Sequence, residues 1–183
     1  MRYTAVSAAI LTIALVSCGS PDSADEATMD TMSQDGVQTQ AVAMIQNAEG
    51  ESVGSVTATE AGGSVLISLN VEGLSSGERG VHVHMTGACE GPDFQSAGGH
   101  WNPNDAQHGL DNPAGQHAGD MPNLVVAEDG TGSLEYQLVG GTFDGLLDAD
   151  GSAFVIHAMA DDQVTDPSGD SGDRIACGVF RAS

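Results

Sequence analysis

Short runs in which apolar and polar residues alternate are the main pattern along the chain after residue 40. Such alternation predicts half-buried strands, because successive side chains of a strand point to opposite faces. The runs lie at 41–46, 52–59, 64–71, 81–84, 124–132 (a strand running into a turn), 133–138, 151–157 and 174–180. Glycine-rich turns separate them, and no stretch shows a convincing amphipathic helix. The pattern predicts an all-β antiparallel sandwich or barrel of about eight strands.

Two stretches lack this alternation and are predicted to be long loops. The first runs from Met85 to Met121 and is rich in Gly, Asn, Asp and Pro, and the second covers residues 161–173. A structureless loop of such length inside a compact domain is usually functional. The first loop contains three histidines and Asp120, so bound metal would explain how it is ordered.

The N-terminus resembles a bacterial lipoprotein signal. A short basic start precedes an apolar run from Ala5 to Val16, and Leu15-Val-Ser-Cys18 follows the pattern of the cleavage box. The resemblance implies a signal peptide at 1–17, lipidation of Cys18, and a lipid anchor as the chain's one membrane contact. The alternative is a simple secretory signal with a chance cysteine. We expect a bacterial cell-envelope protein on the periplasmic side, anchored to the outer membrane because Gly19 is not the inner-membrane retention residue Asp.

Composition and charge define the rest of the chain. Residues 18–39 are polar, acidic and without periodicity, which predicts a disordered tether before a domain at 40–183. The chain has 26 acidic and four basic residues, a net charge of −22. Loss of residues 1–17 would remove Arg2 and no acid, which leaves a net charge of −23. This charge argues against nucleic acid as a partner and against electrostatic docking on anionic lipid.

Three cysteines are present, and lipidation would use Cys18. Cys89 and Cys177 then form an even pair in an exported chain, for which a disulfide is the default expectation. Such a bond would contribute about 4 kcal/mol in the chain-entropy model. The alternative is two free thiols, one of them a metal ligand.

The six histidines all lie between His82 and His157. His82 and His84 are two residues apart in a predicted strand, so both rings point to the same face. Two imidazoles aimed at one point suit zinc, copper, iron or nickel. Read alone, the pair could equally be two ordinary strand histidines.

The motifs around these histidines carry a family resemblance. They are Gly-Val-His-Val-His from Gly80, Ala-Gly-Gly-His-Trp-Asn-Pro from Ala97, His-Ala-Gly-Asp-Met-Pro-Asn from His117, Phe-Val-Ile-His-Ala from Phe154 and Asp-Arg-Ile-Ala-Cys-Gly-Val from Asp173. Together they resemble the copper/zinc superoxide dismutase family, in its bacterial exported branch. The resemblance covers essentially all of 40–183 and implies a flattened eight-stranded Greek-key β-barrel, an immunoglobulin-like sandwich.

The resemblance also implies a role for each site residue. The implied copper ligands are His82, His84, His100 and His157, and the implied zinc ligands are His100, His108, His117 and Asp120. His100 would bridge the two metals, Arg174 would hold the anion beside copper, and Asp161 would link a copper histidine to a zinc histidine. Cys89 and Cys177 match the family disulfide. The plain alternatives are a surface salt bridge to Asp173 for Arg174 and a solvated loop acid for Asp161.

The implied activity is the disproportionation of superoxide to dioxygen and hydrogen peroxide by Cu(II)/Cu(I) cycling, with structural zinc. The rival interpretations are a copper- or zinc-binding module without turnover, a structural β-domain, and a hydrolytic zinc enzyme. The complete copper set with Arg174 argues against the first two, and Asp120, which closes the zinc site, argues against the third. A monomer and a homodimer both remain open. The chain has no lysine to steer superoxide, so we expect a rate that stays flat or rises with salt.

Overall fold

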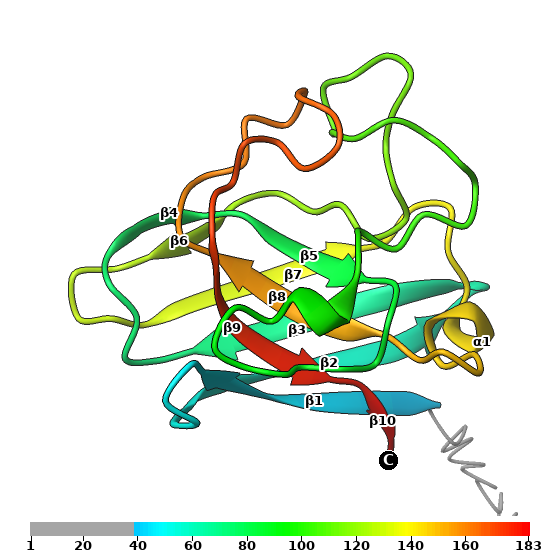
Figure 1. Cartoon of the computed structure of the whole chain (residues 1–183). Coiled ribbons are helices and arrows are strands. Elements are labelled where there is room, and N and C mark those ends of the chain that lie inside the picture. Colours follow the sequence, from blue (N-terminus) through cyan, green and yellow to red (C-terminus); the bar gives the residue numbers. More distant parts are fainter. Residues whose placement is uncertain (1–38) are drawn as a thin grey trace, which may run out of the picture. The chain divides into compact units, whose positions relative to one another are not determined.

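Ten antiparallel strands form one sheet in the part of the chain that the computed structural model describes, residues 39–183 (Figure 1). They are β1 (Gln40–Asn47), β2 (Ser52–Ala61), β3 (Ser64–Val71), β4 (Gly77–Arg79), β5 (Val81–His84), β6 (Leu124–Val126), β7 (Gly132–Gln137), β8 (Ala153–His157), β9 (Arg174–Val179) and β10 (Arg181–Ala182). The order across the sheet is β4-β6-β7-β3-β2-β1-β9-β8-β5, with β10 on β1. Its two end strands, β4 and β5, are separated in the chain by Gly80 alone, so the sheet curls into a nearly closed barrel. The predicted all-β Greek-key barrel is confirmed.

The core follows the alternation in the sequence. In β3, Val65, Ile67 and Leu69 are buried while the residues between them are more exposed. β3 pairs with β2 on one side and with β7 on the other, so the buried apolar side chains of β3 lie beside those of both strands in the barrel interior. By contrast, all residues of β5 and β8 are buried, which places their polar side chains under the loops rather than in water.

The structure adds short elements that the sequence pattern missed. β4 lies between the runs at 64–71 and 81–84, where the alternation predicts no strand, and β10 has two residues. Segments this short show no periodicity, and β4 exists because it pairs with β6. The predicted strand at 124–132 ends at Val126. The helices of the described residues are short: a 3-10 turn, η1 (Gln95–Ala97), and α1 (Phe143–Leu146).

Both predicted loops lie on the same side of the barrel and contact each other (Figure 1). The backbone N–H of His108 donates to Asp166 at 2.8 Å, and that of Asp111 donates to the carbonyl of Gln163 at 3.0 Å. Cys89 and Cys177 form the predicted disulfide, which ties the start of the first loop to β9. The loops are therefore held against strands that carry histidines.

The predictions for the N-terminus concern residues that the structure does not describe. The predicted signal peptide and the lipidated Cys18 lie outside the described residues. So does the tether predicted to run to residue 39, except for that last residue. Among residues 39–183, no helix is both long and apolar enough to cross a membrane.

Candidate metal centre

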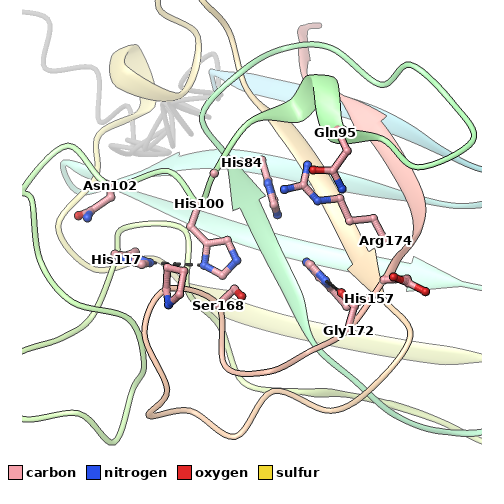
Figure 2. A pocket seen from close by; sticks show the side chains of 12 residues that line it. His84, Gln95, His100, Asn102, His117, His157, Ser168, Gly172 and Arg174 are labelled. Atoms are coloured by element: carbon pink, nitrogen blue, oxygen red, sulfur yellow. Dashed lines mark hydrogen bonds between the residues drawn. The ribbon is translucent and has the colours of Figure 1, made fainter.

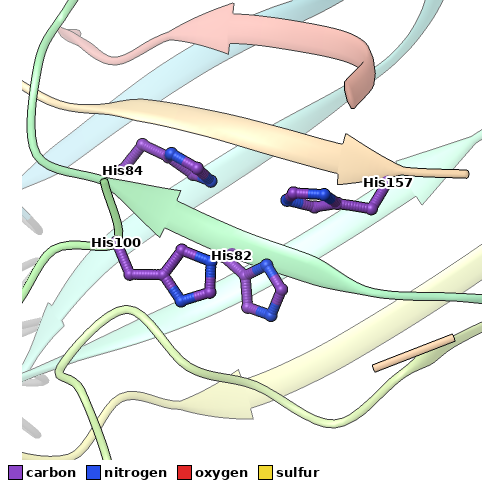
Figure 3. Close-up of side chains that lie close together, drawn as sticks. All are labelled: His82, His84, His100 and His157. Carbon is purple, nitrogen blue, oxygen red and sulfur yellow. The ribbon is translucent and has the colours of Figure 1, made fainter. Parts of the chain in front are cut away.

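Four histidine rings face a common point on the barrel wall (Figure 3). His82 and His84 come from β5, His157 ends the neighbouring strand β8, and His100 comes from the first loop. His100 is held there by a bridge to His84, which extends the sheet by one residue pair. One nitrogen from each ring lies within 4.8 Å of the others, and all four side chains are buried.

The unpartnered nitrogens of these rings are the ones that a metal would take. Nδ1 of His82 and Nε2 of His84, His100 and His157 are buried and make no hydrogen bond. The second nitrogen of His84 donates to the carbonyl of Gly98 at 2.9 Å, and that of His157 donates to the carbonyl of Gly172 at 3.2 Å. Since a carbonyl oxygen only accepts, each of these rings keeps its lone pair on Nε2. Four such buried lone pairs fit a copper ion, for which a set of nitrogen ligands is suited.

Burial keeps these rings in the neutral form that binds metal. Burial lowers the pKa of His82 to about 3, with the neighbouring His100 adding to the effect. Burial likewise lowers the pKa of His157 to about 4 and the pKa of His84 well below its ordinary value. The four rings therefore present lone pairs rather than protons at neutral pH.

A second group gathers around one oxygen of Asp120. Oδ1 lies 3.0 Å from Nδ1 of His100, 3.1 Å from Nδ1 of His108 and 3.3 Å from Nδ1 of His117. The other oxygen accepts backbone N–H groups from Gly109 and His117, both at 2.9 Å. These hydrogen bonds outweigh the effect of burial and hold the pKa of Asp120 well below its usual range. Three imidazoles and one carboxylate make a closed four-coordinate set of the kind that structural zinc takes.

His82 also lies close to this second group, but its free nitrogen belongs to the first. The tightest second cluster contains His82, His100, His108 and Asp120, with His117 beside it. Nε2 of His82, however, is 2.6 Å from Oδ2 of Asp161 and is thereby occupied. The ring that completes the second set is therefore His117, whose Nδ1 faces Asp120 and His100.

Asp161 connects the two groups. Its carboxylate lies 2.6 Å from Nε2 of His82 and 3.0 Å from Nε2 of His108. It is buried, and these contacts overcome burial to lower its pKa. Burial opposes a charge on His108, but its close contacts with the carboxylates of Asp120 and Asp161 prevail and raise its pKa to about 9. Asp161 is thus part of the site and not a solvated loop acid.

A pocket opens onto the first group and is lined by Arg174 (Figure 2). The guanidinium lies beside His84 and donates to the carbonyl oxygens of Phe94 at 2.8 Å and Gly98 at 2.7 Å. No salt bridge to Asp173 is found among the described residues, although Asp173 also lines the pocket. Arg174 therefore holds one positive charge at a fixed place beside the rings.

Comparison with known proteins agrees with this geometry. The family model of copper/zinc superoxide dismutase matches residues 52–180. The chain belongs to the copper/zinc superoxide dismutase family. It is similar to superoxide dismutase [Cu-Zn] 2 of Aquifex aeolicus, with 43% identity over 143 residues that cover 74% of this chain and 82% of that one.

Solved structures in this family have the same fold. A double mutant of a superoxide dismutase-like protein from Bacillus subtilis has a TM-score of 0.70 and 43% identity, over 75% of this chain and 95% of that one. The Cu/Zn superoxide dismutase from Brucella abortus has a TM-score of 0.65 and 29% identity, over 78% of this chain and 99% of that one.

The groups that orient the histidines of the site were not predicted from the sequence. The carbonyls of Gly98 and Gly172 fix two rings, and no side-chain pattern marks a backbone acceptor. Asn123 holds Asp161 from both sides, since its side chain donates to the carbonyl of Asp161 and accepts from its N–H, both at 2.8 Å. Asn123 is the last residue of the motif that begins at His117, and its position in this motif is the only feature of the sequence that could have indicated its role.

Proposed function

We propose that this chain is a copper/zinc superoxide dismutase, which converts two superoxide anions and two protons to dioxygen and hydrogen peroxide. The observation that carries the proposal is the set of four buried, unpartnered histidine nitrogens that lie within 4.8 Å of one another, beside a pocket that three of these rings line together with a fixed arginine. A store or carrier would need the nitrogens but not the arginine. A structural domain would need neither, because unpartnered buried polar atoms destabilise a fold.

His82, His84, His100 and His157 would hold copper, which supplies the one-electron couple that alternately oxidises and reduces superoxide. Arg174 binds the anion through charge-assisted hydrogen bonds from the N–H groups left free by the two carbonyls. Those carbonyls keep the guanidinium facing the pocket, so no side-chain freedom is lost when the anion arrives. Burial lowers the pKa of Arg174, but its ordinary value is so high that it stays charged at neutral pH.

His100 is the proposed proton carrier. Its Nε2 belongs to the copper group and its Nδ1 to the Asp120 group, so one ring reaches both. Nε2 has one lone pair, so it would carry a proton only while it does not hold copper. That proton would lie in the pocket, where it could be given to the second anion as peroxide forms, and the second proton of hydrogen peroxide would come from water. The Asp120 group holds the other nitrogen and so fixes which atom carries the proton.

His100, His108, His117 and Asp120 would hold zinc in a structural role. The set is closed, because its four donors leave no position for a substrate. Zinc would join His100 to the later part of the first loop, which carries the other three ligands, and would maintain the orientation of the His100 ring. Asp161 and Asn123 extend this support to His82.

We also propose that the protein works in the cell envelope, anchored by a lipid on Cys18. The disulfide between Cys89 and Cys177 supports an exported chain, since such bonds persist in oxidising compartments. Fractionation of cells expressing the wild type and Cys18→Ser tests the anchor. Release of the variant from the membrane fraction is expected, and an unchanged distribution would contradict the proposal. Sedimentation of the released chain will decide between monomer and homodimer.

The decisive test of the activity is superoxide removal by pulse radiolysis with copper and zinc bound. The wild type should remove superoxide catalytically, and His157→Ala, which lacks one proposed copper ligand, should do so about 10³-fold more slowly. Arg174→Ala should retain metal and lose about 10-fold in rate, while Arg174→Lys should recover part of it, because a lysine keeps the charge but not the forked geometry. Stoichiometric copper binding without turnover would instead identify a metal-carrying protein.

A further inference from the structure

The single tryptophan of the chain follows His100 directly, and the proposed mechanism gives it no role. Trp101 is 7% exposed and belongs to the main hydrophobic core. Its neighbour His100 is the one residue shared by both metal groups. Any displacement of Trp101 therefore moves the ring on which both groups depend.

The backbone of Trp101 is hydrogen-bonded to residues that are adjacent in the chain to proposed metal ligands. Its N–H donates to the carbonyl of Val83 at 2.8 Å, and its carbonyl accepts from Gly119 at 2.9 Å. Val83 in turn donates to the carbonyl of Gly119 at 3.0 Å. These three residues sit next to His82, His84, His100 and Asp120 in the chain, so this small ladder sets the spacing of four proposed ligands.

The indole ring is fixed from the opposite side by two glycines of the segment around α1. A Cβ added to Gly141 would lie 2.3 Å from Cη2 and 2.4 Å from Cζ3 of Trp101, and one added to Gly145 would lie 3.2 Å from Cζ2. The ring therefore packs directly on backbone, in a recess that only glycine leaves open. We call this recess, formed by Gly141 and Gly145, the glycine socket.

The socket itself is anchored to the barrel. Phe143 and Leu146 of α1 are buried in the main core, and the hydroxyl of Ser152 donates to the carbonyl of Leu146 at 2.6 Å. Asn104 adds a second link, because its side chain donates to the carbonyl of Gly140 at 2.7 Å. The loop that carries His100 is thus attached to a rigid part of the fold some forty residues away.

We infer that Trp101, seated in the glycine socket, is a positioning residue for His100. It touches neither the anion nor the proposed ligand atoms, and acts by fixing the backbone from which the His100 ring projects. The inference rests on the proposed function only where a rate is measured, since the position of His100 can also be read from the spectrum of bound copper.

The main test is Gly141→Ala, which places a methyl group against the indole without changing any proposed ligand. We expect a shifted Trp101 fluorescence maximum, an altered Cu(II) electron paramagnetic resonance spectrum and a rate lowered by about 10-fold to 100-fold, since small misplacements of a reacting group have effects of that size. Gly145→Ala should give the same changes more weakly, because its Cβ would be less crowded. Trp101→Phe combined with Gly141→Ala should restore the copper spectrum, because the smaller ring leaves room for the methyl group.

A control separates positioning from general loss of stability. Leu69→Ala opens a cavity at β3, at a core residue that is not among the nearest neighbours of Gly141 or Gly145, and should lower the melting temperature while leaving the copper spectrum unchanged. A wild-type copper spectrum in Gly141→Ala, despite a shifted tryptophan emission, would overturn the inference. If Gly141→Ala does not fold, a wild-type copper spectrum in both Trp101→Phe and Gly145→Ala would overturn it equally. A wild type that binds copper but shows no turnover would refute the proposed function and leave the spectral test valid.

Discussion

The two proposed metal groups are built from different parts of the molecule. Three of the four copper-group histidines lie on β5 and β8, which pair in a fixed register with Val81 opposite Ile156. The Asp120 group comes entirely from the first loop, which has almost no secondary structure. The copper group is therefore positioned by the sheet, whereas the Asp120 group depends on contacts among its own members.

The charges of the two groups differ in the same way. The copper group consists of neutral rings with unpartnered nitrogens, and three of the rings are carried by paired strands. The Asp120 group is a carboxylate surrounded by ring nitrogens, with His108 protonated at neutral pH when no metal is present. From this difference we expect copper to bind rings that the sheet already positions, and zinc to replace a proton of His108 and to order the first loop.

His157→Ala should break the copper group alone and have the largest effect. Loss of residues that merely orient ligands costs 10–100-fold, so loss of a ligand should lower the dismutase rate by about 10³-fold. Zinc affinity, measured by competition with a chelator, should stay within a few-fold of the wild type. A parallel loss of zinc would show that the two groups are not separable.

Asp120→Ala should break the zinc group and leave the copper group in place. The variant removes the one carboxylate of the set and leaves the N–H groups of Gly109 and His117 without an acceptor. We expect zinc affinity to fall by more than about 100-fold, with one copper still bound per chain. Asp111→Ala, an exposed acid of the same loop, is the matched control and should bind zinc normally. Normal zinc affinity in Asp120→Ala would contradict the assignment.

Acid should destabilise the metal-free protein through the copper group. His82 and His157 have folded-state pKa values of about 3 and about 4, below the ordinary 6.5, so the unfolded chain binds more protons as pH falls. The free energy of unfolding should therefore drop by about 2 kcal/mol between pH 7 and 5.5 from these two rings. His84 acts in the same direction, and His108, whose pKa is raised, offsets about 1 kcal/mol.

The stability of the metal-free chain at alkaline pH should depend on the Asp120 group. The stabilisation from His108 is present at low pH and is lost as pH rises through about 9. Denaturant titrations of the metal-free chain from pH 5.5 to 10 measure both limbs. A stability that is flat or rises on acidification from pH 7 would contradict the buried neutral state of the copper group.

Salt should have the smallest effect, and its sign is informative. The chain carries −22 overall, while Arg174 supplies the one positive side chain lining the pocket among the described residues. Screening weakens the long-range repulsion of superoxide more than the short-range attraction of Arg174. The rate should stay flat or rise by less than about 2-fold as salt is added. A steep fall would show that attraction dominates the approach.

Much of this molecule could be predicted from its sequence, for physical reasons that particular residues illustrate. The alternation in residues 64–71 predicts β3 because one face of that strand is buried along its whole length. The disulfide and the proposed ligands follow from the motifs and their family resemblance. β4 could not be predicted, since three residues show no period and the strand forms only by pairing with β6.

The sequence could not show how the site is supported. The carbonyls of Gly98 and Gly172 are backbone groups, and the glycine socket is about forty residues from Trp101. Such contacts are created when distant segments meet, so no local pattern encodes them. The sequence also does not tell that Nδ1, and not Nε2, is the free nitrogen of His82, because this depends on where Asp161 lies.

Hydrogen exchange of the disulfide-intact chain, with no metal, zinc alone or copper alone, tests the contrast between the two groups most directly. This contrast predicts slow exchange in β5 and β8 under all three conditions. The amides of Gly109 and His117, which bond to Asp120, should exchange fast without metal, slow markedly with zinc and change little with copper alone. Fast exchange of β5 and β8 until copper is added, or protection of the Asp120 loop without zinc, would contradict it.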